Sequence, residues 1–279
     1  MSRLISLMIR DRLTQREMPD ADAELLPGVH WGDPWTLFTP AYWLAQAWMT
    51  QSDDHKANKY QARDSVVDEL GFCMLGGFGI TAELATNAFE RCKHAGFFTR
   101  LETRVEVWTE ALSAPLTIND RPVKYRYPNQ KARFLASAMA YVQQNQLKLD
   151  SGKILRDQLL EIQGVGYKTA SWVTRNVLDS DDVAILDIHL IRAGRLCGLF
   201  SARDDVQRDY LSMEERFLLF SRGLRLRPAI LDCLIWDEMR AAGPLPIDML
   251  NATEHPTSDA DKKSKPRSKA IGSQLQLAL

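Results

Sequence analysis

The residues best suited to chemistry lie in one stretch, LLEIQGVGYKTASWVTRNV, at positions 159–177. An apolar, helix-patterned run breaks at Gly164 and Gly166 and resumes at once. Because glycine adopts backbone angles that a Cβ hinders, we expect two helices joined by a tight hairpin. The N–H groups of such a hairpin and of the next helix point outward together, which favours a bound anion such as phosphate. A plain helix–turn–helix packing element explains the pattern equally well.

Lys168 follows this hairpin directly, at the start of a helix whose other residues are mostly apolar or small. A lysine held near apolar surface and a helix N-terminus has its charged form disfavoured, so a nucleophilic amine is easier to obtain. The alternative is an exposed lysine in the first turn, although cations are poorly placed at the positive end of a helix.

A second candidate, Asp187, ends the apolar segment 183–186 and precedes another apolar helix expected at 188–199. Aspartate is a favoured N-cap residue, which explains its position without any chemistry. A carboxylate held by backbone donors is also well oriented to stabilise positive charge. His189, two residues later, is either a neutral phosphate contact or a buried structural histidine.

The elements that must position these residues are helices, because apolar residues recur at three- and four-residue spacing along most of the chain. A short hairpin is the expectation for 116–127 alone. The expected helices are 37–50, 62–75, 81–95, 102–113, 129–147, 153–163, 167–179, 188–199, 204–221 and 228–241.

Composition divides the chain into three parts. Residues 1–60 form a Trp-rich extension, because four of the seven tryptophans lie between Trp31 and Trp48 and tryptophan is costly to leave exposed. Residues 61–250 form the main domain. Residues 251–279 are rich in Ser, Lys, Pro and Gln and are expected to be a disordered basic and polar tail. The extension is a candidate site for a protein partner.

The 279 residues include 35 basic and 36 acidic side chains, a net charge of −1, so a uniformly basic surface is excluded. The stretch RPVKYRYPNQKAR at 121–133 nevertheless holds five basic residues and no acid, a pattern suited to phosphate contacts or to a solvated face. No apolar run approaches the roughly 20 residues of a membrane helix. The four cysteines form no C-x-x-C pair, so we expect reduced thiols, no zinc or iron–sulfur site, and a cytoplasmic protein without membrane partners.

Taken together, IQGVGYKTASWVTRNV and VAILDIHLIR resemble the helix-hairpin-helix DNA glycosylase superfamily. The chain is most similar to its archaeal-type 8-oxoguanine DNA glycosylase/lyase branch, and the segments YRYPNQKARF and ELGFCML resemble earlier parts of that branch. The resemblance covers about residues 63–242. It implies an all-α, two-subdomain helical fold (HhH-GPD) with the active-site cleft between the subdomains.

The resemblance implies an enzyme that acts on double-stranded DNA containing a damaged base, and it assigns roles to single residues. Lys168 would attack the sugar C1′ and displace the base, and β-elimination from the Schiff base would then nick the strand. Asp187 would stabilise the cationic sugar and help to move the lysine proton. Phosphate contacts would come from Gly164, Val165, Gly166, His189, Lys131 and Arg133. No cofactor or catalytic metal is implied, and a structural monovalent cation at the hairpin carbonyls is the one ion that the family allows.

The base pocket is expected to include Trp236, which would stack on the extruded base, and Asp232, which would read its edge. Phe78, in the glycine-rich loop 76–81, would act as a wedge at the widowed base. Two alternatives remain beside 8-oxoguanine excision. One is the same chemistry on another modified base, in foreign DNA or a specialised pathway such as defence. The other is a DNA- or partner-binding module without catalysis, which would need neither Lys168 nor Asp187.

Overall fold

The computed structural model describes residues 2–9, 11–50, 63–77 and 79–254. Helices dominate this part of the chain, so the all-α class predicted from the periodicity is confirmed. The helices are α1 Pro40–Thr50, α2 Val66–Leu75, α3 Ala82–His94, α4 Val105–Ser113, α5 Pro128–Gln144, α6 Gly152–Leu159, α7 Tyr167–Leu178, α8 Ile188–Leu196, α9 Tyr210–Gly223, α10 Pro228–Ala241 and α11 Leu245–Glu254.

Three small antiparallel hairpins complete the fold. The predicted hairpin within 116–127 is present, and its turn residues Asn119 and Asp120 both have positive φ, of 49° and 59°, as a two-residue hairpin turn of type I′ requires. The N-terminal hairpin pairs Ser2 with Pro19 and Ile9 with Arg12. The strands are β1 Ser2–Ile9, β2 Arg12–Pro19, β3 Glu24–Leu26, β4 Val29–His30, β5 Leu116–Ile118 and β6 Arg121–Val123.

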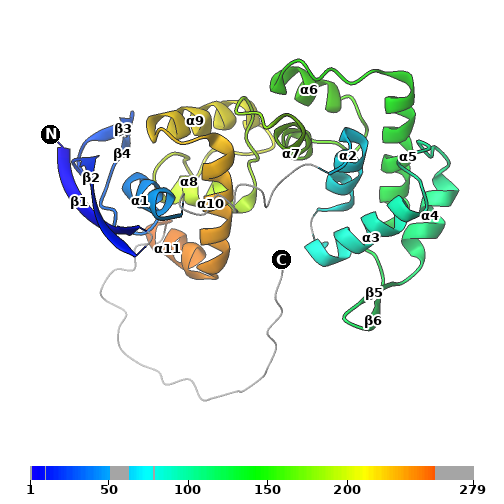
Figure 1. Ribbon diagram of the computed structural model, residues 1–279, viewed down its shortest axis with the longest axis horizontal. Helices are drawn as coiled ribbons and strands as arrows, with labels where there is room; N and C mark the ends of the chain where they lie inside the picture. Colours follow the sequence, from blue (N-terminus) through cyan, green and yellow to red (C-terminus); the bar gives the residue numbers. More distant parts are fainter. Residues whose placement is uncertain (1, 10, 51–62, 78, 255–279) are drawn as a thin grey trace.

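Two hydrophobic cores organise the molecule, and they divide the chain differently from the boundaries at residues 60 and 250. The first core contains Trp43, Leu190 and Phe217, and thus joins the N-terminal segment to helices α8–α10. The second core contains Leu70, Trp108 and Val173, and joins α2 through α7. Figure 1 shows these two groups side by side, with α7 between them. The Trp-rich segment therefore packs into the same core as helices α8–α10.

The last helix of the described chain also differs from the expectation. Helix α11 continues to Glu254, although disorder was predicted from residue 251 onward. Met249 of α11 packs against the first core, so the helix gains a buried contact that its weakly periodic sequence does not reveal. Residues 255–279 lie outside the described residues.

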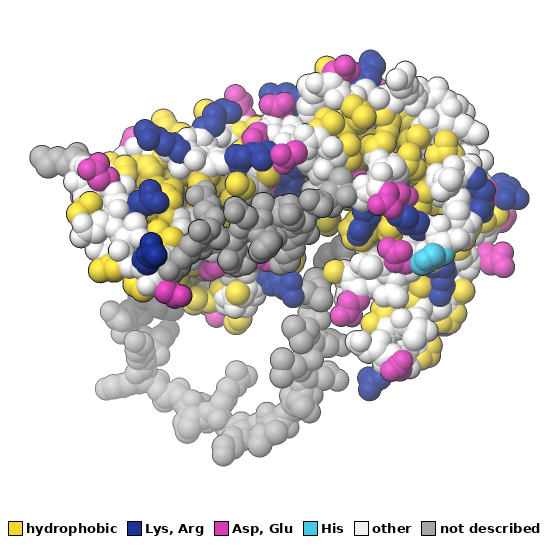
Figure 2. Space-filling view, viewed as in Figure 1, with side chains coloured by type: hydrophobic (Ala, Val, Ile, Leu, Met, Phe, Trp, Pro, Cys, Tyr) yellow, Lys and Arg dark blue, Asp and Glu magenta, His cyan; other side chains and the backbone are white. Residues whose placement is uncertain are grey.

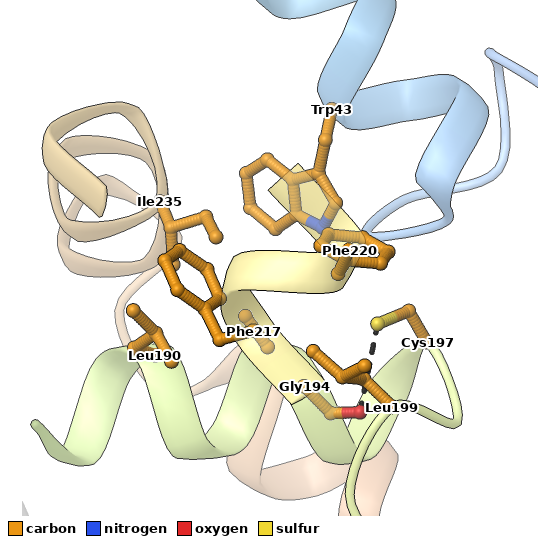
Figure 3. Close-up of a pocket in the computed structure, with 9 residues that line it drawn as sticks. Trp43, Leu190, Gly194, Cys197, Leu199, Phe217, Phe220 and Ile235 are labelled. Atoms are coloured by element: carbon orange, nitrogen blue, oxygen red, sulfur yellow. Dashed lines mark hydrogen bonds between the residues drawn. The ribbon is translucent and has the colours of Figure 1, made fainter. Parts of the chain in front are cut away.

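The first core encloses a small apolar cavity that Figure 3 shows in close-up. Its lining includes Trp43 of α1, Leu190 of α8 and Phe217 of α9. The indole Nε1 of Trp43 is buried there without a partner among the described residues, and the Cys197 Sγ, which points to the Gly194 carbonyl at 3.5 Å, has its pKa raised by burial to about 12. The cavity is thus apolar and too small for a water molecule, unlike a site for DNA.

On the face seen in Figure 2, acidic and basic side chains alternate over both groups of helices. This mixture agrees with the net charge of −1. In the described part of the chain, no helix is both long and apolar enough to cross a membrane.

Candidate active site

The hairpin between α6 and α7 has the tight turn that the sequence predicts. The Val165 amide donates to the Ile162 carbonyl at 3.0 Å. Gly164 has a φ of +86°, and a Cβ at this position would lie 2.4 Å from the ring of Phe134 on α5. Glycine is therefore required here both by the backbone angle and by the packing of the hairpin on α5.

The N-terminus of α7 is open. Gly166 is its N-cap residue, no side chain caps the helix, and a Cβ at Gly166 would meet no atom within 4 Å. The first amides of a helix without a cap can donate to an external anion, and the helix dipole favours negative charge at this end. The predicted phosphate role of the hairpin thus has the geometry that it needs.

Lys168 lies in the first turn of α7 and is exposed. Its Nζ lies 6.0 Å from the ring centroid of Trp172, one turn further along the helix. We expected a lysine held against apolar surface, and the structure differs: Trp172 is its one aromatic contact among the described residues, and the amine stays accessible. An accessible amine can reach a substrate atom, whereas a buried one cannot.

Asp187 is the N-cap residue of α8. Its Oδ1 accepts hydrogen bonds from the amides of His189 and Leu190, both at 2.9 Å. No hydrogen bond from the described residues ends on Oδ2, and the side chain is partly exposed. The capping function and a chemical function are therefore divided between the two oxygens: one oxygen anchors the carboxylate, and the other is available to a ligand.

A buried network fixes the segment 183–186 that delivers Asp187. Glu214 of α9 accepts from Arg156 Nη1 of α6 at 2.6 Å and from the Ala184 amide at 2.9 Å. The same carboxylate accepts from Ser171 Oγ of α7 at 3.4 Å. These bonds connect helices that carry the hairpin, the lysine and the aspartate, so they hold the three parts of the site in one arrangement.

Tyr210 of α9 supports the same segment from the other side. Its hydroxyl donates to the Ala184 carbonyl at 2.8 Å and accepts from the Leu186 amide at 3.3 Å. Its ring stacks on Tyr167, the first residue of α7, at a centroid distance of 4.9 Å. Tyr167 directly precedes Lys168, so this stack links the lysine to the segment 183–186 that leads to Asp187.

Helix α10 brings two of the predicted pocket residues close to the site. Trp236 is partly exposed and makes an edge-to-face contact with His189 at 6.1 Å between ring centroids. The Arg240 guanidinium lies 5.1 Å from the same indole ring. Asp232, one turn before Trp236, is buried and forms an ion pair with Arg175 of α7.

The charged groups of the site influence one another's ionisation, as the pKa values of Asp232 and His189 indicate. Burial raises the pKa of Asp232 to about 7, against the lowering effect of Arg175, and both Asp187 and Lys168 act on this carboxyl. Burial also lowers the pKa of His189, with Asp187 opposing the shift. Three neighbouring cations strengthen the lowering at His189: Arg192, Lys168 and Arg240. His189 is therefore a neutral imidazole at pH 7 within a positive environment.

The other residues predicted to contact DNA, Lys131, Arg133 and Phe78, lie outside this cluster and differ in their surroundings. Lys131 donates through Nζ to the carbonyls of Met74 and Gly76, at 2.5 and 2.6 Å, and so closes the C-terminal end of α2. Two of the three N–H donors of its ammonium are therefore engaged within the protein, and its contact with phosphate stays a prediction. Arg133 is exposed on α5, and its contact with DNA stays a prediction. Phe78 lies outside the described residues.

The residues that sequence analysis missed are mainly arginines and their partners: Arg175, Asn176, Glu69, Arg156 and Glu214. Arg175 follows Lys168 by seven positions and thus shares a helix face with it, a spacing that could have identified it. The described residues contain no cluster of three or more His, Cys, Asp or Glu side chains suited to a metal. The monovalent cation at the hairpin carbonyls stays a prediction.

Comparison of the sequence with known proteins identifies the family to which the chain is similar. A family model described as 8-oxoguanine DNA glycosylase matches residues 49–226. An 8-oxoguanine DNA glycosylase/AP lyase of Saccharolobus solfataricus is 32% identical over 122 residues, covering 40% of this chain and 58% of the relative. The protein of the same name from Thermoplasma acidophilum is 34% identical over 119 residues, covering 41% and 57%. The chain thus spans a little over half the length of these curated relatives.

Among solved structures, the 8-oxoguanine DNA glycosylase of Methanocaldococcus jannaschii aligns with a TM-score of 0.48 and 25% identity, covering 65% of this chain and 80% of its own. The match of the family model extends over well more than half of the chain, from the end of α1 into the loop before α10, and includes Lys168 and Asp187. The chain belongs to the helix-hairpin-helix family of 8-oxoguanine DNA glycosylases.

Proposed function

We propose that this protein is a bifunctional DNA glycosylase/AP lyase that excises 8-oxoguanine from double-stranded DNA. One observation carries the proposal: Lys168 and Asp187 occupy the N-terminal ends of two helices, and both act electrostatically on the buried Asp232. The hydrogen bonds of Glu214 connect α7 with the segment that leads to Asp187. A DNA-binding module needs the open hairpin but needs neither an accessible amine nor an anchored carboxylate. The names of the similar archaeal proteins support the same class of reaction.

In the proposed reaction the enzyme flips the damaged nucleotide out of the duplex, because its C1′ is otherwise out of reach. The Lys168 amine forms a bond to C1′ while the bond from C1′ to the base breaks, and the base leaves with the bonding electron pair. Asp187 Oδ2 stabilises the positive charge that develops on the sugar and accepts the proton that the amine loses. The sugar ring then opens to a Schiff base, and loss of a C2′ proton breaks the C3′–O bond.

The phosphates next to the flipped nucleotide would bind at the open end of α7 and at His189. The amides of the first turn supply donors there. The neutral imidazole of His189 adds one N–H donor, and its surrounding cations favour an anion. Trp236 would stack on the base. Stacking on an aromatic side chain contributes about 1–3 kcal/mol per base.

The test is borohydride trapping with duplexes that contain 8-oxoguanine, other modified bases or no lesion. We expect a covalent adduct with the 8-oxoguanine duplex that disappears in Lys168→Gln. The matched control is Lys153→Gln, because Lys153 is an exposed lysine in the first turn of the neighbouring helix α6. Adduct formation by Lys168→Gln would show that another amine is the nucleophile. Adduct formation with a different lesion alone would favour the second substrate class, and binding without any adduct would favour a non-catalytic module.

A further inference from the structure

A chain of buried polar groups crosses the region where the two cores meet, on the face of α7 that carries Lys168. Residues 168, 172, 175 and 176 share this face, because they are spaced four, seven and eight positions from the lysine. The buried Arg175 guanidinium pairs with Asp232 of α10. The side-chain amide of the next residue, Asn176, donates to Glu69 Oε1 of α2 at 2.7 Å.

The chain is continuous, because Arg175 and Asn176 are also bonded to each other. The Nε and Nη2 atoms of Arg175 donate to Asn176 Oδ1 at 3.2 and 3.1 Å. Glu69 is 1% exposed, and Arg175 and Asp232 are each 7% exposed. Burying two carboxylates and a guanidinium is costly unless they are paired. Arg175 is therefore the cation on which the ionised form of Asp232 depends.

The groups that face Asp232 come from three other elements. Arg175 and Lys168 belong to α7, and Asp187 precedes α8. Tyr210 of α9 is close enough for Asp232 to influence its ionisation. The pKa of Asp232 is raised to about 7: burial is the largest cause, Arg175 opposes it, Asp187 adds to the rise, and Lys168 lowers the pKa. Among the groups that favour the ionised form of Asp232, Arg175 thus has the largest effect.

The charge decides what Asp232 offers to a base beside Trp236, one helical turn away. An ionised carboxylate only accepts hydrogen bonds, whereas a protonated carboxyl group also donates one. The Watson–Crick edge of a guanine-type base presents donors at N1 and at the N2 amino group. The ionised form therefore matches such a base, and the protonated form places a donor against a donor.

We propose that Arg175 is a positioning residue that orients Asp232 and favours its ionised form as the acceptor for the Watson–Crick edge of a flipped guanine-type base. Arg175 thus acts through Asp232 on the step that releases the base, and leaves unaffected the reaction of Lys168 at an abasic site, where no base is bound. This inference rests on the proposed function, since it requires a base that is flipped to a position beside Trp236.

The experiment compares two reactions of Arg175→Met with those of the unaltered protein. Single-turnover release of 8-oxoguanine is measured from pH 6 to pH 9, and strand nicking is measured at a preformed abasic site. Without the guanidinium, Asp232 ionises at higher pH. Its pKa is about 7 with the guanidinium in place, so a rise of one unit lowers the ionised fraction at pH 7 from about one half to about one eleventh, roughly a fivefold loss. We expect that loss at pH 7, recovery toward pH 9, and nicking of abasic DNA within about twofold of the unaltered rate.

The matched control is Arg227→Met. Arg227 also links the end of α7 to α10, through Asp181 and Asp179, and it has no bond to Asp232. We expect its pH dependence to be unchanged. The conservative variant Arg175→Lys keeps a cation but loses the planar guanidinium, and should shift the profile in the same direction by less. If Arg175→Met is poorly folded, the pH profile of Arg175→Lys tests the proposal instead.

Three results would overturn the role of Arg175. They are an equal loss of base release and abasic-site nicking at every pH, the same pH shift in Arg227→Met, and an unshifted profile in both Arg175 variants. If the unaltered protein neither releases a base nor nicks any duplex, the proposed function fails instead. The carboxyl titration of Asp232, followed by NMR without DNA, then still decides on the pairing, because an unchanged midpoint in the Arg175 variants contradicts it.

Discussion

Asp187 has two functions that a pair of substitutions can separate. In Asp187→Asn, the amide oxygen can still accept from the His189 and Leu190 amides, which now donate to Oδ1 at 2.9 Å. The charge is lost, while most of the cap is kept. In Asp187→Ala both are lost. Removal of an N-cap side chain costs about 0.5–2 kcal/mol of stability, so we expect Asn to cost less than about 1 kcal/mol and Ala to cost more.

The reaction rates of Asp187→Asn and Asp187→Ala should not follow the order of their stabilities. If Oδ2 stabilises a cationic sugar, both variants lose that charge, and the single-turnover rate should fall about 100-fold or more, which equals roughly 2.7 kcal/mol. The assays are single-turnover base release and urea unfolding of the same preparations. A suitable control is Ser151→Ala, because Ser151 caps α6 by accepting from the Ile154 amide at 3.3 Å. It should lose stability and keep its rate.

The reasoning is refuted if Asp187→Asn reacts at the unaltered rate. It is also refuted if the rates of all three variants simply follow their stabilities, because Asp187 would then be an N-cap residue and nothing more.

Three further predictions concern the hairpin, the basic stretch and the histidine. Gly164→Ala should destabilise the protein and weaken DNA binding, because the position has a φ of +86° and a Cβ would meet the Phe134 ring. Gly166→Ala should keep the stability within about 1 kcal/mol and weaken DNA binding alone. Unfolding curves and DNA-binding curves of the two variants would show this difference. Lys131→Met should lower the free energy of unfolding by about 1–3 kcal/mol, since two carbonyls lose their donor. It should not change the slope of the logarithm of the DNA-binding constant against the logarithm of the salt concentration, whereas Arg133→Ala should reduce that slope by about one unit. The pKa of His189 is lowered in the folded protein. As the pH falls below 6.5, the usual pKa of histidine, the unfolded chain therefore takes up a proton before the folded protein does, and the free energy of unfolding should decrease. Replacement of His189 by Gln should remove this part of the pH dependence in urea unfolding.

Local pattern was sufficient for the helices and for the hairpin. The α7 helix, its glycine turn and the cap at Asp187 depend on neighbouring residues, and the spacing of apolar side chains carries that information. The N-terminal β1–β2 hairpin was not predicted because its faces are not distinguished by polarity. Leu4 and Met8 are exposed on one face, while Ile5 and Leu7 are buried on the other.

Partners that are distant in sequence could not be predicted from local pattern. Lys131 lies in a basic stretch that is typical of phosphate contacts, and only the fold places the end of α2 beside it. Asp232 was expected in the base pocket, and only the fold shows its pairing with Arg175, 57 positions earlier. The exposure of Lys168 likewise depends on how the two cores meet, and not on the apolar sequence that follows it.

The division of the first core between the two ends of the chain has a consequence for synthesis. Trp43 and Ile235 pack in the same core, yet the ribosome makes them roughly 190 residues apart, a delay of about 10–40 s at typical elongation rates. During this interval the N-terminal segment lacks the helices that bury its tryptophans, whereas the second core, formed by a continuous stretch from α2 to α7, can already close. We therefore expect the part that carries Lys168 to fold first, and the nascent N-terminal segment to depend on chaperones until α10 has emerged.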